Sequence, residues 1–71
     1  MKEKIYNFIV EFMTSNGYSP SVREICSAVG LSSVSTAHAY LQVLLDEGRI
    51  TMKNNTARTI SLVGYKLVKL D

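Results

Sequence analysis

Hydrophobic residues recur at helical spacing through the first two thirds of the chain and then alternate. Between about Lys2 and Asn16, the spacing i, i+3, i+4, i+7, i+8 is typical of one buried helix face. That face comprises Ile5, Phe8, Ile9, Phe12 and Met13. Gly17 stands where a left-handed residue commonly ends a helix, and Pro20 cannot continue one. The pattern therefore predicts an amphipathic helix over about residues 2–16.

A second, shorter helix has a clear start signal. Ser21 and Glu24 stand three residues apart, the spacing of a capping box in which each side chain accepts a hydrogen bond from the other residue's backbone. The apolar positions that follow keep the helical spacing: Val22, Ile25, Cys26 and Val29. Gly30 is expected to end this helix after about eight residues.

A third helix is predicted after a very short connection. Ser33 is the expected N-cap, with Ser32 as the alternative, and Gly48 is expected to stop the helix after about Glu47. Its expected buried stripe consists of Val34, Ala37, Leu41, Leu44 and Leu45. Two helices joined by a turn of about three residues are typical of a helix-turn-helix, whose second helix enters the major groove of DNA.

The apolar period changes from 3.6 to 2 after the third helix. Residues 49–53 alternate, with Ile50 and Met52 on one side, and residues 56–62 alternate again, with Ile60 and Leu62 on one side. The Asn54-Asn55 pair between them suits a turn, since Asn tolerates positive φ. The pattern predicts a two-stranded hairpin.

Together these elements predict a mainly α fold with a small β hairpin, a three-helix winged helix-turn-helix. The 71 residues allow one domain, expected over residues 1–62. Residues 63–71 form a tail with three open roles: an extra strand, packing on the core, or a dimer contact.

The side of the third helix opposite its apolar stripe carries small and polar residues near its start: Ser35, Thr36, Ala39 and Gln42. Such side chains let a helix approach a groove, where Gln pairs with adenine, hydroxyls bond either base and methyl groups touch thymine. At the hairpin tip, Lys53, Asn54, Asn55 and Arg58 suit the sugar-phosphate backbone or a minor groove. His38 lies beside the stripe, where it touches DNA or is solvated or half-packed.

Charge is unevenly distributed along the chain. Residues 1–47 contain three basic and five acidic residues, whereas residues 48–71 contain five basic residues and one acidic residue. A basic C-terminal third on a near-neutral body can bind a polyanion, although a solvated surface explains the same distribution.

Composition excludes several other classes of protein. The apolar fraction of 46% is too high for disorder, and no apolar run approaches a membrane span or a signal peptide. One cysteine, Cys26, predicts a reducing compartment such as the cytoplasm. Cys26 and His38 are too few ligands for zinc, and no paired carboxylates or phosphate loop are present, so we expect no cofactor, no metal, no small-molecule substrate and no enzymatic activity.

The sequence resembles the N-terminal DNA-binding domain of LexA repressors over about residues 4–62. The stretch that carries most of the resemblance is Gly17-Tyr18-Ser19-Pro20-Ser21-Val22-Arg23-Glu24-Ile25. Further matches are Ala28-Val29-Gly30-Leu31-Ser32-Ser33, Ser35-Thr36, Leu41, Leu44, Glu47-Gly48-Arg49-Ile50 and Arg58-Thr59-Ile60. The resemblance implies a three-helix body with a two-stranded wing that binds palindromic operators in double-stranded DNA as a homodimer, in a repressor of the SOS response.

By position, the resemblance implies base contacts from Ser33, Ser35, Thr36, His38 and Ala39. Family members often have Asn and Glu in this segment, so the differences at Ser35, His38 and Ala39 leave the operator sequence open. LexA repressors continue into a self-cleaving peptidase domain that drives dimerisation, and no such domain is expected in these 71 residues. The chain is thus either a domain of a longer repressor or a free-standing regulator. The alternative function is a winged-helix protein-interaction module without specific DNA binding.

Overall fold

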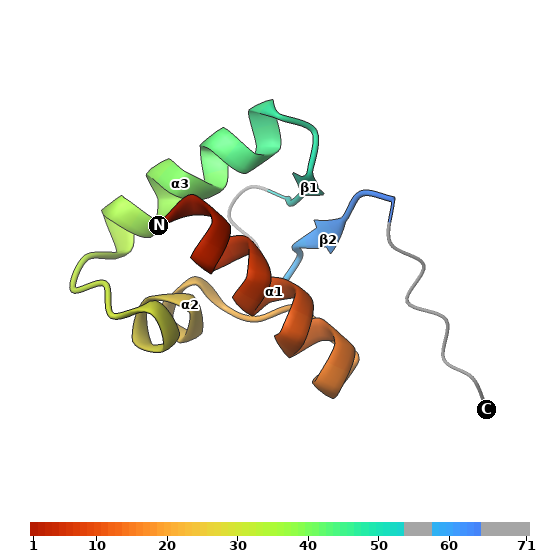
Figure 1. Ribbon diagram of the computed structural model, residues 1–71, viewed down its shortest axis with the longest axis horizontal. Coiled ribbons are helices and arrows are strands. Elements are labelled where there is room, and N and C mark those ends of the chain that lie inside the picture. The colour runs from red at the N-terminus through yellow and green to blue at the C-terminus, as the bar shows by residue number, and fades with distance from the viewer. Residues whose placement is uncertain (54–57, 65–71) are drawn as a thin grey trace.

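The computed structural model describes residues 1–53 and 58–64, which form three helices followed by a small antiparallel sheet (Figure 1). In chain order the elements are α1 (Lys2–Asn16), α2 (Val22–Val29), α3 (Val34–Asp46), β1 (Ile50–Thr51) and β2 (Ser61–Leu62). The predicted fold class, mainly α with a small β hairpin, is confirmed. The predicted bounds of the first two helices are confirmed, and α3 ends one residue before the expected end.

The start and end of α2 follow from its local sequence. Ser21 Oγ accepts from the Glu24 backbone N–H at 3.2 Å, and Glu24 Oε1 accepts from the Ser21 backbone N–H at 2.8 Å, so the predicted capping box is confirmed. Gly30 ends the helix with φ 79°, a left-handed conformation that residues with a side chain rarely adopt. Residues 30–33 then connect to α3.

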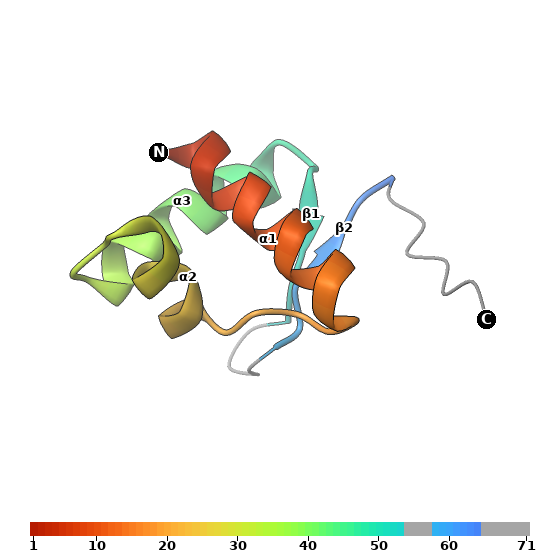
Figure 2. The same ribbon diagram turned by 60° about the horizontal axis from the view of Figure 1, so that its bottom comes forward.

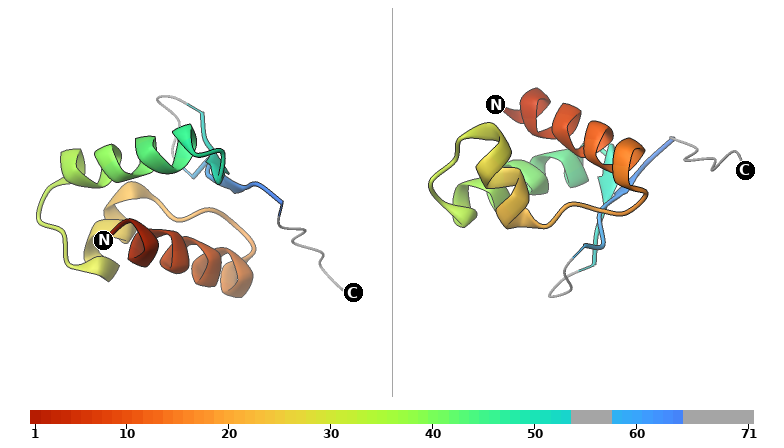
Figure 3. Two further views of the ribbon diagram at one scale, coloured as in Figure 1. Left: turned by 45° about the horizontal axis from the view of Figure 1, so that its top comes forward. Right: turned by 90° about the horizontal axis from the view of Figure 1, so that it is seen from below.

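The core lies where the three helices meet the sheet. Each helix contacts the other two, and α3 also contacts β1. The buried side chains of this core are Ile5, Ile9, Met13, Ile25, Val29, Leu41, Leu44, Ile50, Ile60 and Leu62. Figures 2 and 3 show α2 near the start of α3, and the sheet near its end, with α1 packed alongside. Phe8 and Phe12, expected on the buried face of α1, are half-buried at its edge.

The sheet is much shorter than the predicted strands 49–53 and 56–62. Ile50 lies opposite Leu62 and Thr51 opposite Ser61, and just beyond them the Val63 backbone N–H donates to the Arg49 carbonyl at 3.0 Å. Toward the hairpin tip a side chain takes a backbone position: Thr59 Oγ1 accepts from the Lys53 backbone N–H at 3.0 Å and donates to the Lys53 carbonyl at 3.2 Å. The predicted turn at Asn54-Asn55 and residues 65–71 of the predicted tail lie outside the described residues.

Candidate nucleic-acid interface

The turn between α2 and α3 has helix-turn-helix geometry. The two helices are joined by residues 30–33 and bend by 101°, within the range of about 90–120° for this motif. Ser33 occupies the N-cap position of α3, as predicted, in an extended conformation, although its hydroxyl makes no capping hydrogen bond. The buried Cys26 thiol donates to the Ser33 carbonyl at 3.7 Å, which ties the start of α3 to α2.

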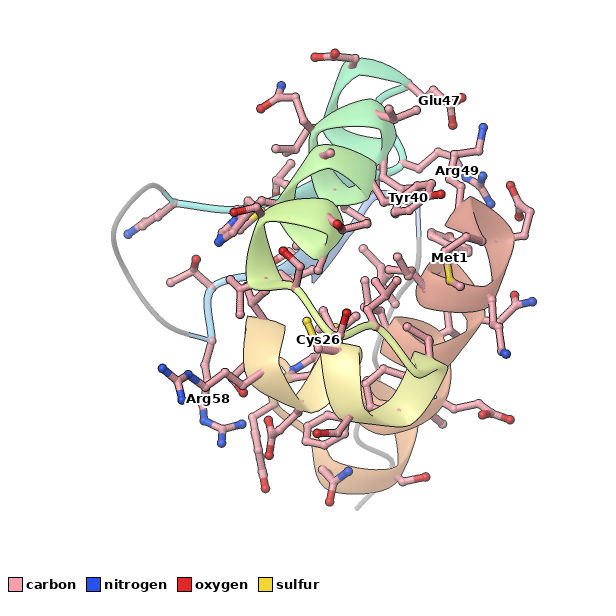
Figure 4. The ribbon with its side chains drawn as sticks, turned by 90° about the vertical axis from the view of Figure 1, so that its left-hand side faces the viewer. Met1, Cys26, Tyr40, Glu47, Arg49 and Arg58 are labelled. Atoms are coloured by element: carbon pink, nitrogen blue, oxygen red, sulfur yellow. The ribbon has the colours of Figure 1, made fainter. Side chains whose placement is uncertain are left out.

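Four of the candidate residues on the first two turns of α3 are exposed: Ser35, Thr36, His38 and Ala39. Within the part of the chain that the structure describes, their side chains make no hydrogen bond or ion pair. Ser33 is half-buried beside them. Polar groups left unpaired on an exposed helix face are free to bond an external partner. The structure therefore brings these five predicted residues together on one end of α3, which faces the viewer in Figure 4.

Gln42, one turn further along α3, is exposed but already partnered. Its amide Nε2 donates to Asp46 Oδ1 at 2.9 Å, four residues ahead on the same helix. This bond uses one of the two Nε2 hydrogens, so the other hydrogen and the Oε1 acceptor remain for a base. The predicted base contact by Gln42 stays a prediction.

Val34 is not in the core, contrary to the sequence prediction. Its side chain is 40% exposed, whereas Ala37, Leu41 and Leu44 on the same stripe are buried. Val34 belongs to the first turn of α3, and the protein covers the stripe only from Ala37 onward. An apolar side chain is therefore available beside Ser33 and Ser35.

A groove of about 290 Å³ opens between the start of α2, the start of α3 and the hairpin. Its lining includes Pro20, Ser21, Val22, Arg23, Val34, Met52, Arg58, Thr59 and Ile60. Arg23 was missed by the sequence reasoning, yet it is exposed and makes no ion pair among the described residues. Its position on the first helix of a helix-turn-helix, the one that crosses the DNA backbone, is the signal that could have found it.

The hairpin places its two described candidate residues differently. Lys53 is exposed and makes no ion pair within residues 1–53 and 58–64. Arg58 instead pairs with Glu24 of α2, with Nη1 at 2.8 Å from Oε1 and Nη2 at 3.2 Å from Oε2. Asn54 and Asn55 lie outside the described residues, so their predicted contacts stay predictions.

Charges that are separated along the sequence are brought together in space. Arg49 donates to Glu3 from both Nη1 and Nη2, and its guanidinium carbon lies 4.1 Å from the Tyr6 ring centroid. Lys2 pairs with Glu47 at 2.6 Å. The hydrogen bond with Arg49 lowers the pKa of the Glu3 carboxyl and raises the pKa of Arg49. In Figure 4 this network, marked by Glu47 and Arg49, lies at the opposite end of the molecule from Arg58. The basic third predicted from sequence is thus partly neutralised by acidic residues of the body.

No group of three or more His, Cys, Asp or Glu side chains among the described residues is placed to hold a metal ion. No single helix within residues 1–53 and 58–64 is long and apolar enough to cross a membrane. Only the bent pair of α2 and α3 passes that test of length and composition.

Known proteins resemble the chain along almost its whole length. The family described as the LexA DNA binding domain matches residues 2–59. The LexA repressor of Clostridium kluyveri is 48% identical over 62 residues, covering 87% of this chain and 31% of that protein. The LexA repressor of Ruminiclostridium cellulolyticum is 44% identical over 62 residues, covering 87% of this chain and 29% of that protein. The LexA repressor of Carboxydothermus hydrogenoformans is 42% identical over 65 residues, covering 92% of this chain and 32% of that protein. The chain spans about a third of the length of these relatives. It belongs to the LexA DNA-binding domain family.

Proposed function

We propose that this chain is the sequence-specific, double-stranded DNA-binding module of a LexA-like transcriptional repressor, with α3 in the major groove. The observation that carries this proposal is the exposed end of α3 at a helix-turn-helix bend, where the candidate side chains have no hydrogen-bond partner among residues 1–53 and 58–64. The family match supports DNA as the partner, and the similarity to LexA repressors supports repression. The protein-interaction alternative has no observation in its favour.

Base contacts are assigned to the first two turns of α3. The hydroxyls of Ser33, Ser35 and Thr36 can donate to or accept from base edges, and the Ala39 methyl can touch a thymine methyl. His38 presents ring nitrogens on the same exposed end. Binding these groups to bases breaks no hydrogen bond between described residues.

Phosphate contacts are assigned to the cations that flank α3. Lys53 on the hairpin and Arg23 on α2 are exposed and make no ion pair among the described residues, so their charge is available to the DNA backbone. Asn54 and Asn55 are proposed to contact the sugar-phosphate backbone or a minor groove together with Lys53. Such contacts position the domain and carry no sequence information of their own.

Two copies on a palindromic operator complete the proposal. A two-fold arrangement places two α3 helices in successive major grooves. Two linked modules bind the operator more tightly than one module binds a half-site, because the second binding event becomes intramolecular. Residues 1–62 are proposed to form the DNA-binding unit and residues 63–71 a contact or connection beyond it. A cytoplasmic location follows from the DNA partner, and no catalytic role is proposed for these residues.

Alanine variants on α3 test the assignment of base contacts against matched controls on α1. Thr36→Ala and Ser35→Ala remove exposed hydroxyls from α3, while Thr14→Ala and Ser15→Ala remove exposed hydroxyls from α1. Each α3 variant should change discrimination at one or two base pairs of a selected duplex by roughly 1–3 kcal/mol per good contact. Fluorescence anisotropy against single-base-pair variants of the duplex measures this. An equal loss on every duplex, or no difference from the controls, contradicts base contact by α3.

A further inference from the structure

The Arg58 side chain is 44% exposed, yet its guanidinium group has three partners within the protein. Nη1 donates to the Ser19 carbonyl at 3.1 Å as well as to Glu24, Nη2 donates to Glu24, and the ring centroid of Tyr18 lies 5.1 Å from the guanidinium carbon. This arrangement uses the planar fork of arginine, which lysine cannot reproduce. Arg58 also has φ 57°, a backbone conformation that non-glycine residues seldom adopt.

Glu24 is held in place independently of Arg58. Its Oε1 accepts from the Ser21 backbone N–H in the capping box, so the carboxylate is oriented by α2 itself. The backbone hydrogen bond from Ser21, and then the hydrogen bond from Arg58, lower the pKa of Glu24. Glu24 is therefore a charged, oriented acceptor against which the hairpin can be fixed.

The segment after Arg58 is fixed to the same loop. Two residues further on, the Ile60 backbone N–H donates to the buried Ser19 Oγ at 3.1 Å. Thr59, between these two anchors, bonds the backbone N–H and carbonyl of Lys53 through its hydroxyl. The position of Lys53 thus depends on Arg58 and Ile60 through Thr59.

We propose that the Arg58–Glu24 pair positions the hairpin, so that Lys53 reaches the DNA backbone, and that Arg58 does not itself hold a phosphate. This inference rests on the proposed function. Moving Arg58 to a phosphate would break its hydrogen bonds to Ser19 and Glu24. It would also leave the Glu24 carboxylate near a second negative charge with no cation between them. Arg58 and Glu24 are thus positioning residues, which hold the hairpin against α2.

Three variants separate a positioning role from a phosphate contact: Arg58→Lys, Arg58→Ala and Lys53→Ala. If Arg58 positions the hairpin, Arg58→Lys and Arg58→Ala should each abolish the phosphate contact of Lys53. Operator binding should then weaken by about fivefold at about 0.15 M salt, which is the contribution of one phosphate contact to the affinity. Adding Lys53→Ala to either variant should cause no further loss. The slope of log affinity against log salt should fall by about one in the single and the double variants alike.

A phosphate contact by Arg58 predicts different results. Arg58→Lys would keep the wild-type affinity and salt slope, and the double variant Arg58→Ala/Lys53→Ala would lose about two units of slope. Either result overturns the proposal. Urea denaturation checks that each variant folds, and Arg58→Lys carries the test if Arg58→Ala does not fold.

Two readouts that need no DNA keep this inference separate from the proposed function. Without the guanidinium, the pKa of Glu24, followed by NMR of its side-chain carboxyl, should rise in Arg58→Ala. Exchange of the Ile60 amide hydrogen should be faster in Arg58→Lys than in the wild type. Unchanged values overturn the positioning role. Failure of the wild type to bind any duplex would instead overturn the proposed function.

Discussion

Replacing Ser19 by alanine tests how the hairpin is attached to the helices. Ser19 is 4% exposed, and its Oγ accepts from the Ile60 backbone N–H at 3.1 Å and donates to the Pro20 carbonyl at 2.9 Å. Alanine would leave the N–H of Ile60, itself 3% exposed, buried without an acceptor. An unsatisfied buried donor costs about 1–3 kcal/mol, so the free energy of unfolding should fall by that amount.

Urea denaturation followed by far-UV circular dichroism measures the change, with Ser61→Ala as the matched control on the exposed side of β2. In a domain of this size 1 kcal/mol corresponds to about 4–8 °C in Tm, so Ser19→Ala should melt at least about 4 °C below the wild type. The control should stay within about 0.5 kcal/mol of the wild type, as exposed substitutions usually do. A Ser19→Ala variant as stable as the control would refute the role of this hydroxyl.

Three further predictions concern the stability of the helices. Ser21→Ala removes the hydroxyl that caps α2 and should lower the free energy of unfolding by about 1 kcal/mol in urea; an effect equal to that of the exposed Ser27→Ala would contradict the capping role. Gly30→Ala should lower the free energy of unfolding by roughly 1 kcal/mol in the same assay, because the residue has φ 79°. Steric crowding is not the reason, since no described atom lies within 4 Å of an added Cβ. A D-alanine at this position should restore the wild-type stability, and equal stability of the L- and D-alanine proteins would exclude a conformational cause. The pKa values of Glu3 and Glu24 are lowered in the folded state, so the stability these carboxylates add is complete above the ordinary pKa of about 4.5 and is lost as the pH falls through the lowered values. Thermal melts from neutral to acid pH should show this decline, and Glu24→Gln should reduce it; a decline of the same size in both proteins would argue against the contribution of Glu24.

The sequence predicts those parts of the fold that local chemistry decides. The apolar period gives the length of α1, and the Ser21–Glu24 spacing and Gly30 give both ends of α2, because caps and left-handed glycines act within one turn of the chain. The hairpin was predicted too long because alternation does not reveal that the Thr59 hydroxyl takes the place of a backbone partner for Lys53. A buried hydroxyl such as that of Ser19 also leaves no periodic signal.

The same distinction applies to the candidate site. The exposed end of α3 was predictable because it follows from one helical stripe. The predicted burial of Val34 was wrong, since the buried part of that stripe begins at Ala37. Which basic side chains are paired within the protein, and which are left to bind DNA, was not predictable. Arg49 and Arg58 bond acidic residues 46 and 34 positions away in the chain, and only the fold brings these pairs together.

If α3 binds specific sequences of double-stranded DNA, selection from a random duplex pool should enrich a defined motif, arranged as a palindrome if two copies bind. Anisotropy at two salt concentrations should then show an affinity for this motif that falls steeply with salt. Weak binding of all sequences to the same extent, lost at moderate salt, would contradict sequence-specific binding by this domain.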